Sequence, residues 1–168
     1  MKKKSKMLLF KGVDKAGVLY GFGRESDAMV CLEKILRRNP RDVGALLLKA
    51  RILLDVGQSK AALDIVNVVL AHYPNKYEAL LTKALVCYDR GRNRDALRIF
   101  AQLGKTPRIR LEERRYLYSF WVNALVGDKR WRTAKRVLDE ALDRFPDDDI
   151  LNHFKTVLGK KLSKRRPS

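Results

Sequence analysis

The sequence predicts an all-α protein, a right-handed α-solenoid in which helix-turn-helix repeats stack on one another. One short pattern, opening on glycine and closing on proline, recurs along the chain, and an apolar run with helical character precedes its later copies. Self-similarity of this kind is the signature of a stacked repeat. The four copies are GRESDAMVCLEKILRRNP from Gly23, GQSKAALDIVNVVLAHYP from Gly57, GRNRDALRIFAQLGKTP from Gly91 and GDKRWRTAKRVLDEALDRFP from Gly127.

The period of the pattern is 34 residues, and it holds at several positions of the repeat. The residues that obey it are Gly23, Gly57 and Gly91, then Ala16, Ala50 and Ala84, then Ala28, Ala62 and Ala96, and finally Pro40 and Pro74. A last copy fits after an insertion near Lys105–Arg110, because Ala134 and Pro146 keep the mutual spacing of Ala62 and Pro74. We therefore expect about three complete helix pairs, preceded by a degenerate one.

Each copy encodes two helices joined at the glycine. Glycine accepts the left-handed conformation that ends the first helix. Proline closes the second helix because it cannot continue one. The small alanines let the two helices cross closely. Each pair has an apolar face that it cannot bury alone, and stacking on the next pair buries it.

The N-terminal copy is incomplete. Its first helix would run from Met7 to Phe22, but Gly12, Gly17 and Gly21 interrupt it, and each glycine costs a helix about 1 kcal/mol relative to alanine. Whether residues 7–22 form a helix, an irregular cap or a disordered segment stays open. The predicted organisation is a basic arm and degenerate first helix at 1–23, the solenoid at 24–146, a capping helix at 147–163 and a basic tail at 164–168.

The end of the chain predicts a capping helix. Asp147, Asp148 and Asp149 follow Pro146, and carboxylates suit the free N–H groups and positive dipole of a helix start. An apolar stripe follows, as a terminal helix with one polar side requires. Its members are Ile150, Leu151, Phe154, Val157, Leu158 and Leu162.

The combined spacing resembles the tetratricopeptide repeat family over roughly residues 24–146. The resemblance is carried by Ala50, Gly57, Ala62 and Pro74, by Ala84, Gly91, Ala96 and Phe100 with Pro107 shifted by one, and by Leu125, Ala134, Ala141 and Pro146. The last copy departs from the pattern at Val122, where a small residue belongs. The resemblance implies stacked helix pairs whose first helices line a concave groove that binds peptide segments.

The chain is strongly basic. Among its 168 residues, 37 Lys and Arg oppose 19 Asp and Glu, a net charge of +18 that is concentrated near the two ends. Such a field attracts nucleic acid, an anionic membrane surface or an acidic protein, unless it is only solvated surface. The apolar run Met7–Phe10 is too short for a signal peptide, and no stretch approaches a membrane-spanning length. We expect a cytoplasmic protein in which Cys31 and Cys87 are reduced thiols.

The sequence contains no catalytic constellation, so we expect a non-enzymatic protein without cofactor or metal. His72 and His153 have no partner implied by the sequence and are interpreted as surface or packing residues. Cys31 and Cys87 fall in register with apolar residues of other copies, which is typical of small core residues. Helix capping explains Asp147–Asp149 better than a metal site does.

The resemblance places a partner-binding groove on the first helices. Its predicted residues are Leu47, Arg51, Leu54, Leu81, Leu85, Tyr88 and Asn123. Such a face is unusually apolar for a solvated surface. A partner segment, a second copy of the chain or its own Met7–Phe10 segment would cover it. Alternatively, the face assignment is off by one residue and the leucines are core.

The leading hypothesis is an interaction scaffold or adaptor that captures a partner segment in this groove. An alternative is a nucleic-acid- or ribonucleoprotein-associated protein, whose basic ridge and tails contact phosphates without reading bases. The candidate ridge residues are Arg92, Arg94, Arg110, Arg114, Arg130, Arg132, Lys135 and Arg136. A secretion-type chaperone that shields an apolar client segment is a further alternative. Capture of a C-terminal chaperone motif is not expected, because the carboxylate-clamp positions of that subclass are mostly apolar here. The partner's identity and self-association stay open.

Overall fold

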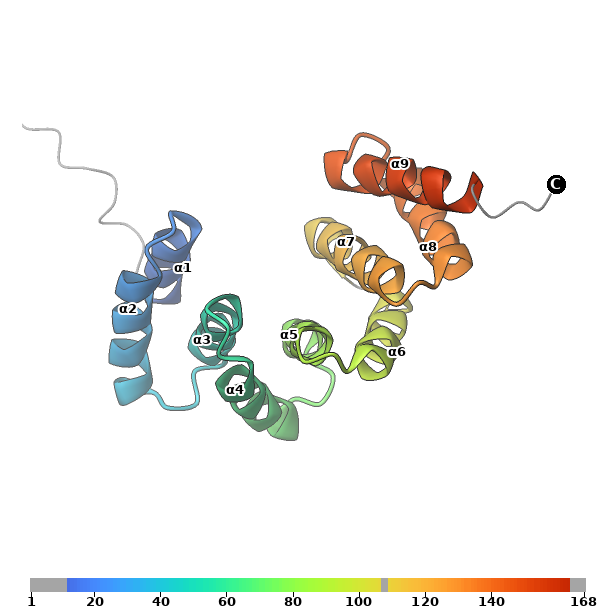
Figure 1. The fold of residues 1–168 in the computed structure, drawn as a ribbon. Helices are drawn as coiled ribbons and strands as arrows, with labels where there is room; N and C mark the ends of the chain where they lie inside the picture. Colours follow the sequence, from blue (N-terminus) through green and yellow to red (C-terminus); the bar gives the residue numbers. More distant parts are fainter. Residues whose placement is uncertain (1–11, 107–108, 164–168) are drawn as a thin grey trace, which may run out of the picture. The chain divides into compact units, whose positions relative to one another are not determined.

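The structure, a computed structural model, describes residues 12–106 and 109–163 (Figure 1). Every regular element in this part of the chain is an α-helix, as predicted. The helices are α1 (Val13–Gly21), α2 (Glu25–Arg38), α3 (Val43–Asp55), α4 (Ser59–His72), α5 (Tyr77–Asp89), α6 (Asn93–Gly104), α7 (Leu111–Gly127), α8 (Trp131–Arg144) and α9 (Asp149–Ser163). The chain divides into two compact units, Met1–Thr82 and Lys83–Ser168, with the boundary inside α5. The predicted basic arm and tail lie largely outside the described residues.

Neighbouring helices pack on one another within each unit. In the first unit α1 packs on α2 and α3 on α4, and α3 also contacts α1 and α2. In the second unit α7 contacts α6, α8 and α9, and α8 contacts α9. Pair-on-pair packing of consecutive helices is the architecture of an α-solenoid. The prediction of an all-α solenoid is confirmed.

The periodic alanines lie where the helices pack most closely. The alanines of the 34-residue pattern have no exposed surface in either unit. They are Ala16, Ala50 and Ala84 of the first helices and Ala28, Ala62, Ala96 and Ala134 of the second helices. A larger side chain at these positions would overpack the helix crossings. Val122, which departs from the pattern in α7, is also fully buried.

The first helix of the N-terminal pair is short. α1 has nine residues, against 13 in α3, and begins after Gly12, whose φ is 71°. Gly17 and Gly21 lie within it. Ala16 nevertheless joins a buried cluster with residues of α2 and α3, namely Ala28, Leu32, Ala45 and Ile52. The degenerate pair is therefore an integral part of the first unit. Residues 7–11 of the predicted helix lie outside the described residues.

The turn between the two helices of a pair has one geometry, which three glycines adopt. Gly23, Gly57 and Gly91 have φ of 69°, 78° and 71°. At Gly57, the glycine N–H donates to the Leu54 carbonyl at 3.0 Å and the following N–H donates to the Leu53 carbonyl at 2.7 Å. This pair of bonds satisfies the free carbonyls of the helix end. The predicted role of these glycines is confirmed.

In the fourth copy the prediction that Gly127 takes the left-handed conformation of the turn is wrong. Gly127 is the last residue of α7, and Lys129 takes the left-handed position with φ of 58°. Its N–H donates to the Val126 carbonyl at 3.1 Å, and the next N–H donates to the Leu125 carbonyl at 2.9 Å. The turn thus keeps its geometry while its glycine is replaced by lysine.

We expect Lys129→Gly to stabilise the protein by about 1 kcal/mol, because an L-residue with a side chain is strained in the left-handed region. Gly57→Ala makes the reverse change at the equivalent turn position and should destabilise the protein by a similar amount. A Cβ at Gly57 would meet no atom within 4 Å, so this loss would be conformational and not steric. Urea unfolding of both variants checks the pair. Equal stability of Lys129→Gly and the parent would contradict the strain at Lys129.

The insertion before the last copy lengthens a helix. α7 has 17 residues, against 13 in α3, and the additional turn is at its N-terminal end, from Leu111 to Arg114. The end of α6 packs tightly against α7, because a Cβ at Gly104 would lie 2.7 Å from Cζ3 of Trp121. Only glycine fits this approach without displacing the indole ring.

The capping helix α9 is present and begins as predicted. Asp148 accepts a hydrogen bond from the Leu151 N–H at 2.9 Å, and Asp149 lies in the first turn. Leu151 and Leu158 of the predicted stripe are buried. The assignment of Ile150 to that stripe is wrong: its side chain is 56% exposed. Ile150 directly follows the acidic start of the helix and does not contribute to the core.

Candidate partner-binding faces

The first unit presents three of the predicted groove residues on one helix. Leu47, Arg51 and Leu54 lie at successive turns of α3 and are all half-buried. Half-burial of two leucines beside an arginine leaves apolar surface next to a charge. Together with Tyr20 and Asp55, these residues are named here the inner face of the first unit.

A polar cluster joins α1 to α3 on this inner face. The Tyr20 hydroxyl donates a hydrogen bond to the Asp55 carboxylate. The Arg51 Nε lies 3.6 Å from the same carboxylate. Burial, and next the bond to Asp55, raises the pKa of Tyr20 to about 12. The cluster therefore fixes Arg51 and the C-terminal end of α3 relative to α1.

The raised pKa of Tyr20 predicts a loss of stability in strong alkali. The tyrosine keeps its proton to about pH 12 when folded but loses it near pH 10 when unfolded. The stabilisation is therefore complete below pH 10 and disappears as the pH rises to 12. The melting temperatures of the parent and of Tyr20→Phe should converge over that interval. Tyr73→Phe controls for the loss of a hydroxyl, and a parallel decline of parent and Tyr20→Phe would contradict the prediction.

Two predicted groove residues of α5 are buried. Leu81 and Leu85 are 9% and 8% exposed. They match the alternative in which these leucines are packing residues. Tyr88 is half-buried, and its hydroxyl lies 2.9 Å from where a Cβ would stand at Gly127. Tyr88 therefore packs against the end of α7.

The second unit presents a polar and aromatic surface on α7. In repeat register, Ser119 corresponds to Leu47 and Asn123 to Arg51. Asn123 is exposed and Ser119 half-buried, while Tyr116, one turn earlier, is 53% exposed. Tyr116, Ser119 and Asn123 are named here the inner face of the second unit. This face lacks the leucines of the first.

A pocket of about 280 Å³ adjoins the inner face of the second unit. Arg115 lies beside it, with its guanidinium carbon 5.3 Å from the Tyr116 ring centroid and Nη1 3.7 Å from an Asp148 oxygen. Aromatic, acidic and aliphatic groups thus meet at one place. The pocket is lined by Arg115, Tyr116, Ser119, Asp147, Asp148, Asp149 and Ile150. Sequence reasoning assigned the three aspartates to helix capping only, and no sequence signal placed them next to Tyr116.

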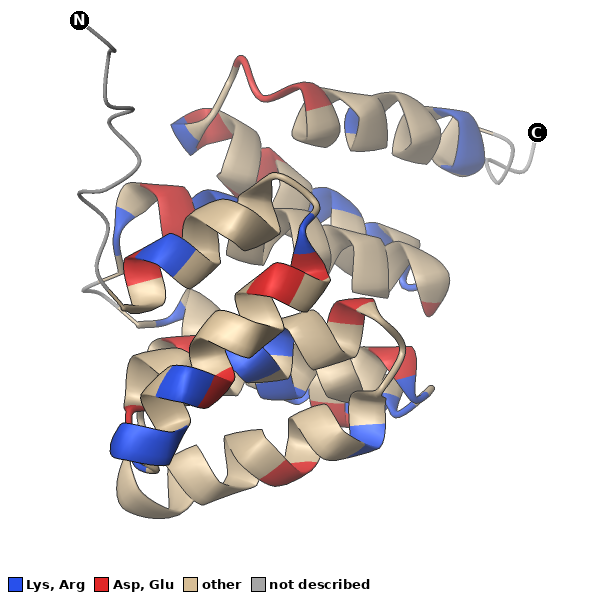
Figure 2. Cartoon of the chain, turned by 90° about the vertical axis from the view of Figure 1, so that its left-hand side faces the viewer, with Lys and Arg blue, Asp and Glu red and all other residues tan. Residues whose placement is uncertain are grey.

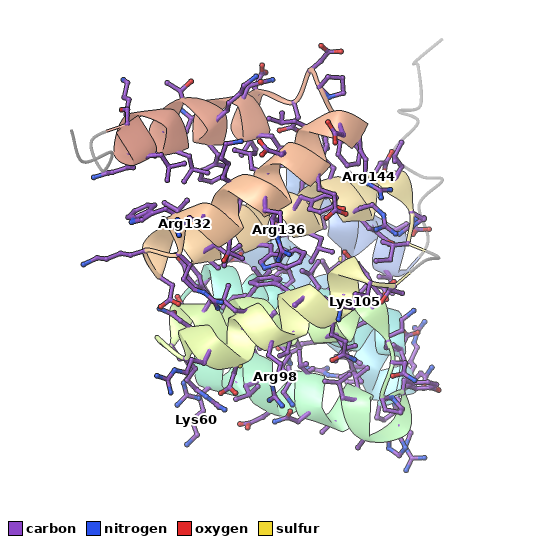
Figure 3. The ribbon with its side chains drawn as sticks, turned by 90° about the vertical axis from the view of Figure 1, so that its right-hand side faces the viewer. Lys60, Arg98, Lys105, Arg132, Arg136 and Arg144 are labelled. Atoms are coloured by element: carbon purple, nitrogen blue, oxygen red, sulfur yellow. The ribbon has the colours of Figure 1, made fainter. Side chains whose placement is uncertain are left out.

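The predicted basic ridge is partly neutralised. An Arg92 nitrogen lies 2.6 Å from Asp95, Lys135 lies 2.6 Å from Asp139, and the Arg110 Nε donates to Glu113 at 2.9 Å. Arg94, Arg130, Arg132 and Arg136 are exposed. Figure 3 shows Arg132, Arg136 and Arg144 along α8. It also shows Arg98 on α6 and Lys105 at the end of α6. Among the predicted ridge residues, these four exposed arginines therefore lie on the second helices α6 and α8 of the second unit or directly before α8.

Arg114 is a structural residue, which corrects its place in the predicted ridge. Its side chain is buried, with 8% of the residue exposed. Its guanidinium donates to the Thr106 carbonyl at 2.8 Å and to the Gly104 carbonyl at 3.4 Å. These carbonyls belong to the end of α6, where they have no helical partner. The extra turn of α7 carries Arg114 to this position.

The histidines and cysteines show no site chemistry. His72 and His153 are exposed, on α4 and α9. Both cysteines are free thiols, and burial raises the pKa of the Cys87 thiol. Within residues 12–106 and 109–163, no group of three His, Cys, Asp or Glu side chains is placed to hold a metal ion. The helices of that same part are all too short or too polar to cross a bilayer.

Comparisons with known proteins agree with this architecture. Residues 19–84 match the family model described as tetratricopeptide repeat. Among solved structures, a thermophilic tetratricopeptide repeat protein of Thermus thermophilus is similar, with a TM-score of 0.55 and 19% identity, over 88% of this chain and 97% of that one. A search of curated proteins gave no match. Tetratricopeptide repeats generally serve protein–protein interaction and not catalysis. Residues 19–84 are therefore similar to tetratricopeptide repeats, and the described helices share the fold of the solved tetratricopeptide repeat structure.

Proposed function

We propose that this protein is a non-enzymatic interaction scaffold that captures partner segments on the inner faces of its two units. The observation that carries the proposal is the inner face of the first unit, where Leu47 and Leu54 are only half-buried beside Arg51. Apolar surface with an adjacent charge suits an extended segment of mixed character. Side-chain pockets provide specificity in such complexes, and a preformed face lowers the entropic cost of binding.

The second unit supports capture of a different kind of side chain. Asp147 and Asp149 are exposed beside Tyr116 in the pocket of about 280 Å³. A lysine or arginine of a partner would meet carboxylates and an aromatic ring there. The two units would thus recognise an apolar and a basic portion of a partner respectively.

The test is selection of binders from a random peptide library on the immobilised full-length protein. Selected peptides should lose at least about tenfold in affinity for Leu47→Glu/Leu54→Glu, since buried apolar contact is replaced by charge. The matched control is Val30→Glu/Val68→Glu, which alters valines of the second helices α2 and α4 that are 51% and 55% exposed. Equal loss in both variants, or no loss in the first, would contradict binding at the inner face.

A further inference from the structure

The N-terminal helix pair contains a basic cavity that the interaction faces do not use. Its volume is about 540 Å³, and it is lined by Gly12, Lys15, Cys31, Lys34, Ile35, Arg37, Arg38 and Asn39. It opens where the start of α1 meets the C-terminal half of α2. Figure 2 views the molecule from the side on which these two helices lie in Figure 1, with Lys and Arg in blue.

Four cations line this cavity without a compensating acid. Among the described residues, no Asp or Glu contributes to its wall. Lys15 and Lys34 are exposed, as are Arg37 and Arg38. In contrast, Arg24 on the same pair lies 2.7 Å from Asp27. Like charges gathered around one cavity repel one another unless an anion enters it.

The other lining groups suit a phosphate. The cavity has the volume of an ordinary small-ligand site. Gly12 precedes the first turn of α1, whose N–H groups and positive dipole end favour an anion. Two guanidinium groups offer bidentate donors for phosphate oxygens, and two ammonium groups add point charges. Because no aromatic ring lines the cavity among the described residues, stacking of a base is not part of this recognition.

We propose that this cavity binds a run of adjacent phosphate groups. Consecutive phosphates bring several negative charges into one small volume, which matches a cavity lined by four cations. Such a run occurs in free polyphosphate and in the backbone of single-stranded RNA, and the chemistry of recognition is the same. Leu47, Leu54 and Tyr116 do not line this cavity, so its failure would leave the proposed peptide capture untouched.

The test uses the full-length protein with two probes, inorganic tripolyphosphate by calorimetry and a short labelled polyuridine RNA by fluorescence anisotropy across a salt series. Lys15→Gln/Lys34→Gln should weaken binding about tenfold at low salt. For RNA it should also flatten the slope of log affinity against log salt by about 0.7 for each lost phosphate contact. The arginines are kept, because basic residues in the last turn also stabilise α2.

Lys60→Gln/Lys155→Gln is the matched control, since it removes two exposed lysines of α4 and α9. If tripolyphosphate binding weakens in Lys15→Gln/Lys34→Gln but not in the control, the result would support the site. It would also show that free polyphosphate is a sufficient ligand for it. The same dependence for RNA alone would support the site with the RNA backbone as its ligand. Equal losses in both double variants, or no binding of either probe by the parent, would overturn the proposal.

Cys31 provides a second readout that does not depend on mutation. It lines the cavity and is half-buried, whereas Cys87 is only 2% exposed. Thiol alkylation should therefore report mainly on Cys31. We expect tripolyphosphate or RNA, whichever binds, to slow this labelling severalfold at saturation, and the same protection of Lys15→Gln/Lys34→Gln to require about tenfold more ligand. An unaltered labelling rate in the saturated parent protein would also overturn the proposal.

Discussion

A Leu81→Glu/Leu85→Glu double variant is expected to lose its fold. Both leucines are more than nine-tenths buried. Each substitution removes a buried apolar side chain and forces a carboxylate into its place, unless the surrounding helices separate. The combined loss should exceed about 4 kcal/mol, a large part of the stability of an ordinary domain. Far-ultraviolet circular dichroism and thermal unfolding of the purified variant measure it.

The comparison variant is Leu47→Glu/Leu54→Glu. These leucines are half-buried, so their replacements can turn toward solvent. We expect this variant to keep its helicity and to lose less than about 2 kcal/mol. Leu47 and Leu81 occupy the same register of the repeat, which makes the pair a sharp test. Retention of the full helical signal by Leu81→Glu/Leu85→Glu would show that these residues belong to a binding face after all.

Arg114→Ala is expected to destabilise the protein by about 2–3 kcal/mol. It removes the donors that satisfy the partly buried Gly104 and Thr106 carbonyls, and acceptors shielded from water without partners are costly. Arg114→Lys should recover only part of the loss, because one ammonium cannot present the same planar fork. Urea unfolding of the three proteins measures the series.

Arg115→Ala is the matched control for this series, since it removes the same chemical group one residue later. The Arg115 side chain is 45% exposed, and its ion pair with Asp148 is 3.7 Å long. Exposed pairs of this kind contribute little, so the change should stay within about 0.5–1 kcal/mol. Equal destabilisation by the two alanine variants would show that Arg114 acts through charge alone.

The helix pairs could be predicted because they rest on local rules with a fixed spacing. Gly57 takes the left-handed turn conformation that glycine favours. Ala50 and Ala62 lie at helix crossings that admit only small side chains. The position of the left-handed residue in the fourth turn was not predicted correctly from its residue type. Lys129 has no turn signature, and the nearby Gly127 indicated a left-handed turn residue two positions before the one that adopts this conformation.

The binding residues were harder to predict because burial differs between copies in the same register. Leu47 and Leu81 are the same residue type at equivalent positions, yet the first is half-buried and the second buried. The assignment of Arg114 to the exposed basic ridge was wrong for a related reason. The insertion adds a helical turn that carries this arginine under α6, whereas a list of charges treats it as surface.

The central claim is that partner segments bind on the inner faces, and amide chemical-shift mapping with a library-selected peptide tests it most directly. Binding should perturb the amides of Arg51 and Leu54 on α3, or of Tyr116 and Asn123 on α7. Unit-specific binding is expected, since the two faces differ in chemistry. Perturbations confined to second-helix residues such as Val68 and Arg136 would contradict the claim.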